Sequence, residues 1–147
     1  MKLTKRTTAV LNGALNKEGL RSTKQREHVF SVLLGQPDHP TADEIHARAK
    51  LEMSSISLAT VYNCLETLVD CSLVRQVNFE REPSRFCPNL AEHAHFYDDN
   101  HGRVYDIDLP NNFLDEMRMV LPEGFEASQI NLSFRGKKSK EENDGQT

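Results

Sequence analysis

The sequence lacks any apolar run of membrane-spanning length, and only 37% of its 147 residues are hydrophobic. A transmembrane helix needs about 20 mostly apolar residues, so this pattern excludes a membrane-embedded protein. The first residues, MKLTKRTTAVLNGALN, also lack the apolar stretch of a secretory signal peptide and are typical of a charged helix. Length and hydrophobic content predict one or two small domains with modest cores, in a cytoplasmic protein.

Cysteine is scarce as well. The three cysteines stand at positions 64, 71 and 87, a number and spacing that do not suggest a disulfide framework. Cys64 and Cys71 are seven residues apart on one predicted helix, so we expect both to pack as small apolar groups. Thiols of this kind are typical of a reducing cytoplasm.

The formal net charge of −4 is unevenly divided along the chain. Residues 1–87 hold 12 basic and 10 acidic side chains, a charge of +2, whereas residues 88–147 hold 6 and 12, a charge of −6. Within residues 1–26, seven basic residues accompany a single acid, Glu18. This asymmetry indicates a DNA-facing half and a second half that faces elsewhere, although a solvated basic helix surface would give the same charges.

Residues 57–72 predict an amphipathic helix that runs into a hairpin. Apolar residues recur at spacings of three and four and predict one buried stripe: Leu58, Val61, Leu65, Leu68 and Val69. The other face is polar and suits base edges and phosphates: Ser57, Thr60, Tyr62, Asn63 and Thr67. Residues 73–79 then alternate as a strand does, residues 80–84 turn the chain, and residues 85–87 begin the return strand.

Two more helices are predicted before this one. One follows Ser22, a plausible N-cap, and stops before Gly35. The next begins at Thr41, where Glu44 three residues later completes a capping-box pattern. Three helices and then a hairpin predict a winged helix-turn-helix, with an ordinary core helix packed on a hairpin as the alternative.

The second half contains residues that commonly bind metals. On a strand, His93 and His95 would place both imidazoles on one face, within reach of one ion. Residues 99–102 predict a turn, and a hairpin closed there brings Asp106 opposite His95. With Cys87 as a thiolate, these groups form a candidate metal site, although a His-x-His pair alone is a weak signal.

In these segments the chain resembles the ferric uptake regulator family, known as Fur. The resemblance covers about residues 10–136. The segments that match are residues 19–26, 39–45, 57–63 and 75–86, followed by His93-Ala94-His95 and Gly102-Arg103-Val104. The resemblance implies an α+β fold, in which an N-terminal winged helix-turn-helix precedes a small α/β dimerisation domain.

The resemblance also implies where these parts begin and end. The DNA-binding domain would span residues 1–87, with a hinge at about 86–91. The dimerisation and metal-sensing domain would span residues 92–136, and residues 137–147 would form a disordered tail. Within the second domain, residues 109–121 are expected to form a helix and residues 125–134 the last strand, with Ile130, Leu132 and Phe134 alternating.

The family's regulatory metal site has a further ligand, a histidine just before the third helix. In this chain that position is His39, which from the residues alone would be an exposed turn histidine. The implied ligand set is His39, Cys87, His93, His95 and Asp106. It would hold one divalent metal per subunit, either zinc or ferrous iron, with manganese as a further option.

The chain departs from the family pattern in two ways. Most members carry a Cys-x-x-Cys after the His-x-His that helps to hold a structural zinc, but here Asp98 and His101 stand at those places, and the C-terminal cysteines are missing too. A four-thiolate zinc site is therefore excluded, as in the Irr branch and some peroxide-sensing relatives. Cys87 stands where the family has an acidic ligand. Four interpretations of it stay open: a metal ligand, a redox-reactive thiol, a haem ligand through Cys87-Pro88, or a packed residue of the wing.

The expected function is that of a metal-responsive DNA-binding transcriptional regulator, mostly a repressor, of iron-homeostasis or peroxide-stress genes. Metal would close a homodimer on an inverted-repeat operator in double-stranded DNA. Predicted DNA contacts are Lys24, Arg26 and Arg75 to phosphates, and Ser57, Thr60, Tyr62 and Asn63 on the recognition helix.

Three alternatives stay open. One is a haem-responsive iron regulator of the Irr type. A second is an interaction module that uses the winged-helix shape without salt-dependent DNA binding. The remote third is a zinc hydrolase, which the lack of an HExxH motif and of a His-x-Glu with Cys-x-x-Cys argues against, so we expect no enzymatic activity.

Overall fold

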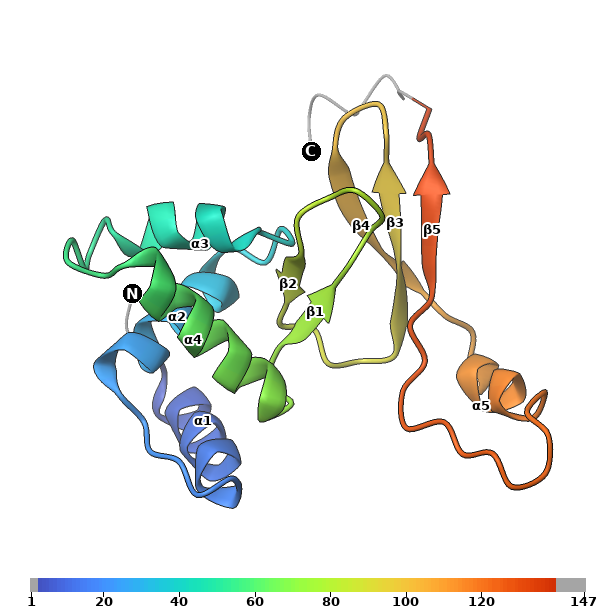
Figure 1. The fold of residues 1–147 in the computed structure, drawn as a ribbon, viewed down its shortest axis with the longest axis horizontal. Helices are drawn as coiled ribbons and strands as arrows, with labels where there is room; N and C mark the ends of the chain where they lie inside the picture. Colours follow the sequence, from blue (N-terminus) through green and yellow to red (C-terminus); the bar gives the residue numbers. More distant parts are fainter. Residues whose placement is uncertain (1–2, 140–147) are drawn as a thin grey trace. The chain divides into compact units, whose positions relative to one another are not determined.

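The computed structural model describes residues 3–139, and the chain divides into two compact units between Leu90 and Ala91. The first unit consists of helices and a hairpin, and the second of a small sheet with a short helix (Figure 1). The predicted hinge at about 86–91 stays a prediction, because a division into compact units says nothing about motion. Among residues 3–139, no helix is long and apolar enough to cross a membrane.

Each of the four helices of the first unit begins after a hydroxyl side chain that caps it. The helices are α1 (Lys5–Lys17), α2 (Lys24–Gly35), α3 (Ala42–Ala49) and α4 (Leu58–Asp70). The capping oxygens of Thr4, Thr23, Thr41 and Ser57 each accept a hydrogen bond from the backbone N–H three residues later. Such a cap stabilises a helix by about 1 kcal/mol, because it satisfies an N–H that has no partner within the helix.

The predicted capping box at Thr41 and Glu44 is confirmed, whereas the prediction of Ser22 as the N-cap of α2 is wrong. Thr23 caps that helix, and the Ser22 hydroxyl instead donates a hydrogen bond to Glu27 at 2.7 Å. The shift is by one residue, and it occurs because two adjacent hydroxyl residues offer equivalent local signals.

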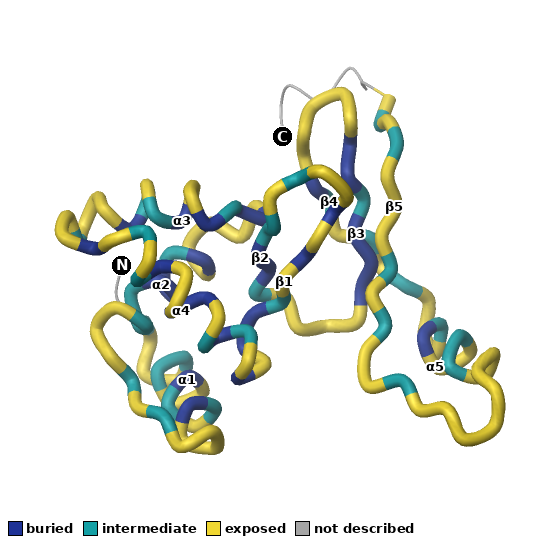
Figure 2. The backbone as a smooth tube through the Cα atoms, in the orientation of Figure 1, coloured by how far each residue is buried: buried dark blue, intermediate teal, exposed yellow. Residues whose placement is uncertain are grey.

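The core of the first unit lies between the inner faces of its helices (Figure 2). α4 contributes Val61, Cys64, Leu65 and Leu68, which are all at most 5% exposed. Leu58 and Val69 lie at the edges of the predicted stripe and are only half-buried. Cys64 and Cys71 are buried as predicted, and burial raises the pKa of both thiols, so they pack as apolar groups.

The predicted hairpin is present but short. β1 (Arg75–Val77) pairs with β2 (Arg85–Cys87) in antiparallel register, with Arg75 opposite Cys87. β2 is also tied to the loop before α3, because the Phe86 N–H donates to the Pro40 carbonyl at 3.0 Å. Helices followed by a hairpin confirm the winged helix-turn-helix.

The second unit is built on a three-stranded sheet of order β4-β3-β5. β3 (His93–Asp98) pairs antiparallel with β4 (Arg103–Asp108) and parallel with β5 (Ser133–Gly136). The predicted turn over residues 99–102 and the pairing of His95 with Asp106 are both confirmed.

Two predictions for this unit are wrong in extent. The helix expected over residues 109–121 is α5 (Phe113–Arg118), which follows a left-handed Asn112 that supplies no side-chain cap. Leu121 precedes a proline, a position that disfavours helical backbone. The last strand, expected over 125–134, is only Ser133–Gly136, because its length is set by pairing with β3 rather than by its own alternation.

Asp98 joins three parts of the second unit at the end of β3. It is 0% exposed and accepts hydrogen bonds from the backbone N–H of Asn100 at 2.9 Å and of Lys138 at 3.3 Å. His101 Nδ1 forms an ion pair with the same carboxylate. The turn and the segment after β5 are thus fastened to β3. Of the tail predicted to be disordered, residues 137–139 are described and include Lys138, whereas residues 140–147 lie outside the described residues.

The pKa of Asp98 lies below its ordinary value of 3.8, although burial by itself raises it, because hydrogen bonds from His101, Asn100 and Lys138 favour the charged form. A carboxyl with a lowered folded-state pKa stabilises the protein above its unfolded pKa, and that stabilisation is lost as the pH falls through the folded value. We expect Asp98→Asn to destabilise the protein at neutral pH, with the difference from wild type shrinking in acid below about pH 4.

The test is urea unfolding of both proteins between pH 3 and 7, followed by circular dichroism. Asp108→Asn, which removes an exposed carboxylate from β4, is the matched control and should leave the pH profile close to that of wild type. An Asp98→Asn difference that stays constant down to pH 3 would contradict the assignment.

Candidate metal centre and DNA interface

Three potential metal ligands converge on the sheet of the second unit. His93 and His95 lie on the same face of β3, and Asp106 is opposite His95 on β4. The Asp106 Oδ1 lies 3.2 Å from His93 Nε2 and 3.3 Å from His95 Nε2, and the two Nε2 atoms are 3.0 Å apart. Both imidazoles are buried. Ligands held about 2.1 Å from one zinc ion lie roughly 3–4 Å from each other, so these separations suit a shared cation.

A hydrogen bond orients His93 within this group. Its Nδ1 lies at the Ala91 carbonyl, which can only accept, so Nδ1 carries the proton. In the neutral ring, Nε2 then presents its lone pair toward the Asp106 carboxylate and His95. With this lone pair, His93 Nε2 can accept a hydrogen bond from His95 Nε2 or bind a cation. An imidazole that donates through its other nitrogen to a carbonyl is the usual arrangement for a metal ligand.

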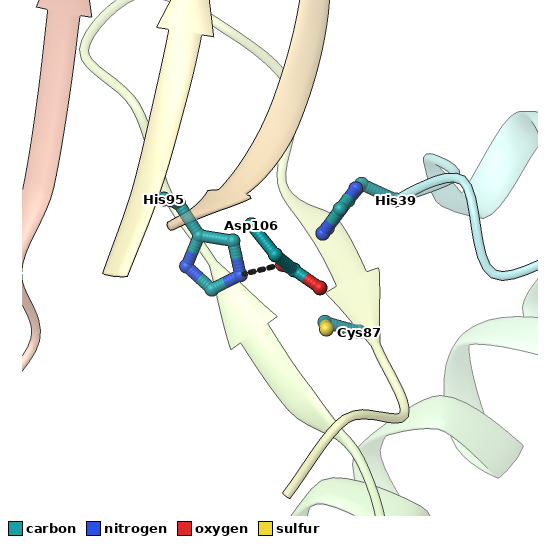
Figure 3. A group of neighbouring side chains, drawn as sticks. All are labelled: His39, Cys87, His95 and Asp106. Carbon is teal, nitrogen blue, oxygen red and sulfur yellow. Dashed lines mark ion pairs between the residues drawn. The ribbon is translucent and has the colours of Figure 1, made fainter. Parts of the chain in front are cut away.

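The first unit brings together two more of the predicted ligands. His39 lies in the loop before α3, Cys87 ends β2, and their ligand atoms lie within 4.8 Å of each other. Both residues are buried, at 5% and 2% exposure. Figure 3 draws these two side chains together with His95 and Asp106, and its dashed line marks the ion pair of the latter two. The residues alone suggested that His39 is an exposed turn histidine, but its side chain is buried.

His39 also has an unusual backbone. Its φ of 58° is in the left-handed region, and it is followed by a proline. A residue other than glycine in this region typically costs about 1–3 kcal/mol and is retained where the surrounding structure holds it, often at a functional site.

The donor types present fit a divalent transition metal. Imidazole nitrogens and a thiolate suit zinc, and imidazoles with a carboxylate also suit ferrous iron. His93, His95 and Asp106 come together in the second unit, and His39 and Cys87 in the first. That all five ligate one ion stays a prediction.

Some of the side chains predicted to contact DNA are exposed on α4, and others already form hydrogen bonds within the protein. Tyr62, at 51% exposure, and Asn63 lie on the outer face of α4. The Ser57 hydroxyl caps α4 and shares a 2.9 Å hydrogen bond with Thr60, so both are already engaged. Their contacts with DNA stay predictions.

Of the basic residues predicted to contact phosphates, one is exposed and two donate hydrogen bonds to backbone carbonyls. Lys24 is exposed at the start of α2. Arg26 donates to the Arg21 carbonyl at 2.7 Å, and Arg75 donates to the Leu90 carbonyl at 3.1 Å. Because a guanidinium has five donors, each arginine keeps N–H groups for a phosphate.

Sequence reasoning missed the residues that hold the loop around His39. Arg85 Nη1 donates to the His39 carbonyl at 3.1 Å, and Arg48 binds both Asp38 oxygens at 2.9 Å. Burial raises the pKa of Asp38, but the Arg48 guanidinium outweighs it and holds the pKa below its usual value. No local signal announces the Arg85 contact, because its partner is 46 residues away.

A winged helix with a polar outer face on α4, followed in the same chain by a sheet on which imidazoles and a carboxylate converge, defines a metal-responsive transcriptional regulator. The chain belongs to the ferric uptake regulator family, whose pattern matches residues 17–135. The protein regulates iron-homeostasis or peroxide-stress genes. Members of this family are DNA-binding dimers and act as regulators rather than enzymes.

Known proteins similar to this chain include peroxide-responsive and ferric uptake regulators. The chain is 34% identical over 107 residues to the peroxide-responsive repressor PerR of Staphylococcus epidermidis, covering 73% of this chain and 70% of that protein. It superposes on the Campylobacter jejuni peroxide stress regulator with a TM-score of 0.68 at 27% identity, covering 95% of this chain and 98% of the other. It superposes on the Pseudomonas aeruginosa ferric uptake regulator with manganese with a TM-score of 0.70 at 26% identity, covering 88% of this chain and 98% of the other. These relatives support a regulator of peroxide-stress or iron-homeostasis genes and do not favour the Irr alternative.

We expect His93→Ala with His95→Ala to abolish stable metal binding without unfolding the protein. Loss of two imidazoles removes ligands outright, so the effect should exceed the roughly 10- to 100-fold cost of losing a ligand's hydrogen-bond partner. Elemental analysis of dialysed protein measures the metal content, and circular dichroism checks the fold. His28→Gln, whose parent histidine contacts the Ala49 carbonyl in the first unit, should keep wild-type metal content. Full metal content in the double variant would remove both histidines from the site.

Proposed function

We propose that one divalent metal per subunit is bound jointly by His39, Cys87, His93, His95 and Asp106, and that this ligation controls operator binding by a homodimer. The observation on which the proposal rests is the convergence of His93, His95 and Asp106, whose ligand atoms lie 3.0–3.3 Å apart. The paired His39 and Cys87 of the first unit supply two further donors of suitable type.

Joint ligation would act as a conformational clamp. A bound cation supplies the positive charge that lets imidazoles, thiolate and carboxylate lie together. Because the donors are divided between the two units, their simultaneous use fixes the arrangement of the winged helix relative to the sheet unit. Ligation shifts the population only to the extent that the DNA-binding arrangement binds the metal more tightly than the open one. Neutral imidazoles and the thiolate are the ligating forms, so binding should release protons and weaken on acidification.

The DNA target is proposed to be an inverted repeat. In a symmetric dimer, two copies of α4 would enter successive major grooves of a duplex with half-sites about one helical turn, roughly 34 Å, apart. Asn63 is the proposed base-reading residue, since an amide can pair bidentately with adenine, and Tyr62 lies beside it on the exposed face. From the similarity to a peroxide-responsive repressor, we infer repression of peroxide-stress genes rather than of iron-homeostasis genes.

We expect Asn63→Ala to relax sequence preference at one base pair by about 1–3 kcal/mol, because a specific base contact is lost. Lys24→Ala should weaken binding to all sequences about equally and reduce the salt slope by about one, because a phosphate contact is lost. Binding of metal-loaded protein to an operator and its single-base variants, at several salt concentrations, measures both effects.

Lys50→Ala removes an exposed lysine outside the predicted contact set and serves as the control for Lys24. An unchanged base preference in Asn63→Ala would exclude its reading role. Equal affinity of the wild type for all duplexes, without salt dependence, would instead favour the interaction-module alternative.

Cys87 distinguishes this chain from the family pattern and should decide which metal binds. If its thiolate is a ligand, Cys87→Ser should strongly lower zinc content, and Cys87→Asp should shift the preference toward iron or manganese, because a carboxylate is a harder ligand. Elemental analysis after competition between the metals measures both.

Cys64→Ser is the matched control, because it alters a buried thiol of the helical core and should affect stability but not metal content. If Cys87 merely packs, neither Cys87 variant will change metal stoichiometry. A thiolate-type haem absorption band that Cys87→Ala removes would favour the haem alternative.

A further inference from the structure

We propose that Arg85 is a positioning residue, which holds His39 in its metal-binding conformation through the His39 backbone. The inference rests on the proposed function, because it assumes that His39 is a ligand. His39, Arg85 and the contacts between them all lie in the first unit.

β2 is attached to the loop before α3 at consecutive residues. Arg85 Nη1 donates to the His39 carbonyl at 3.1 Å. The residues that follow these two are also joined, because the Phe86 N–H donates to the Pro40 carbonyl at 3.0 Å. Thr41 and Arg85 also form an isolated antiparallel β-bridge. The loop that places His39 is therefore held by the strand of the wing and not by α3 alone.

The backbone of His39 requires such support. Its φ of 58° lies in a region that few residues other than glycine adopt, and the following proline further restricts its conformation. Without the Arg85 hydrogen bond, the loop can relax toward extended backbone, and relaxation would swing the imidazole away from its present place. The planar guanidinium fixes the direction of this hydrogen bond better than a lysine ammonium on a flexible stem would.

The same strand also supplies the second ligand. Arg85 and Cys87 are two residues apart on β2, so they lie on one face of the strand. The hydrogen bond from Arg85 to the His39 carbonyl therefore couples the position of the His39 imidazole to that of the Cys87 thiol. The two ligands thus form a half-site held by one strand and the loop attached to it, and pre-organisation of this kind raises affinity by reducing the ordering required.

The test uses the full chain with cobalt(II) as the probe, because thiolate ligation by Cys87 gives a charge-transfer band. We expect Arg85→Gln to lower cobalt affinity by about 10- to 100-fold, as loss of a partner of a ligand does, with unchanged stoichiometry and a retained thiolate band. Arg85→Lys should recover part of the affinity. Arg81→Gln, which makes the same charge change in the turn between β1 and β2, should bind as wild type does.

A double-mutant cycle separates positioning from general damage. In a His39→Ala background, Arg85→Gln should have no further effect on cobalt affinity, because the residue it positions is gone. An equal loss in both backgrounds, or wild-type affinity in Arg85→Gln, would overturn the inference. If His39→Ala alone leaves affinity unchanged, the proposed ligand set is wrong and the inference falls with it. If Arg85→Gln fails to fold by circular dichroism, the cycle is run with Arg85→Lys, and the same outcomes decide.

Discussion

The antiparallel pairing of β3 with β4 is the constraint on which the candidate metal site depends. Side chains on a strand alternate between faces, so His93 and His95 can share a face only while β3 remains extended. A slip of one residue in the pairing would move Asp106 to the opposite face of the sheet. The observed register, with His95 opposite Asp106, places a carboxylate oxygen 3.2–3.3 Å from both imidazoles.

The end of the same strand shows how a small sheet is held together without thiolates. Asp98 and His101, which stand at the two positions of the Cys-x-x-Cys implied by the resemblance, form an ion pair in which the carboxylate is fully buried and the imidazole is exposed. A buried carboxylate is stable only when its lone pairs are satisfied, and here backbone donors from the turn and from Lys138 satisfy them. The end of β3 is thus held by hydrogen bonds whose strength depends on the charge of one carboxylate.

The first unit combines two tasks in one hairpin. β2 pairs with β1 to form the wing, and it also binds the loop that precedes α3. The residues of β2 therefore contribute to the shape of the DNA-binding unit and to the placement of His39 and Cys87. Any change in the position of these two side chains must be accommodated by the wing, since both are attached to it through short backbone segments. A metal ion held by these two side chains would therefore act directly on the wing.

The sequence by itself determined the features whose signals are local. Helical periodicity predicted α2, α3 and α4, and the capping box at Thr41 predicted the start of α3. The turn at residues 99–102 predicted the β3–β4 register, because a hairpin aligns residues close together in the chain. Only the tertiary structure decided the parallel pairing of β5 with β3, the short α5, the bond from Lys138 to Asp98 and the bond from Arg85 to His39. The β5 pairing and these two bonds join segments about 40 residues apart, and an interaction between such segments leaves no periodicity or motif in either of them. Such pairings are selected by the geometry of the assembled fold, which is why His39 was assigned by resemblance and Arg85 was found only from its contacts.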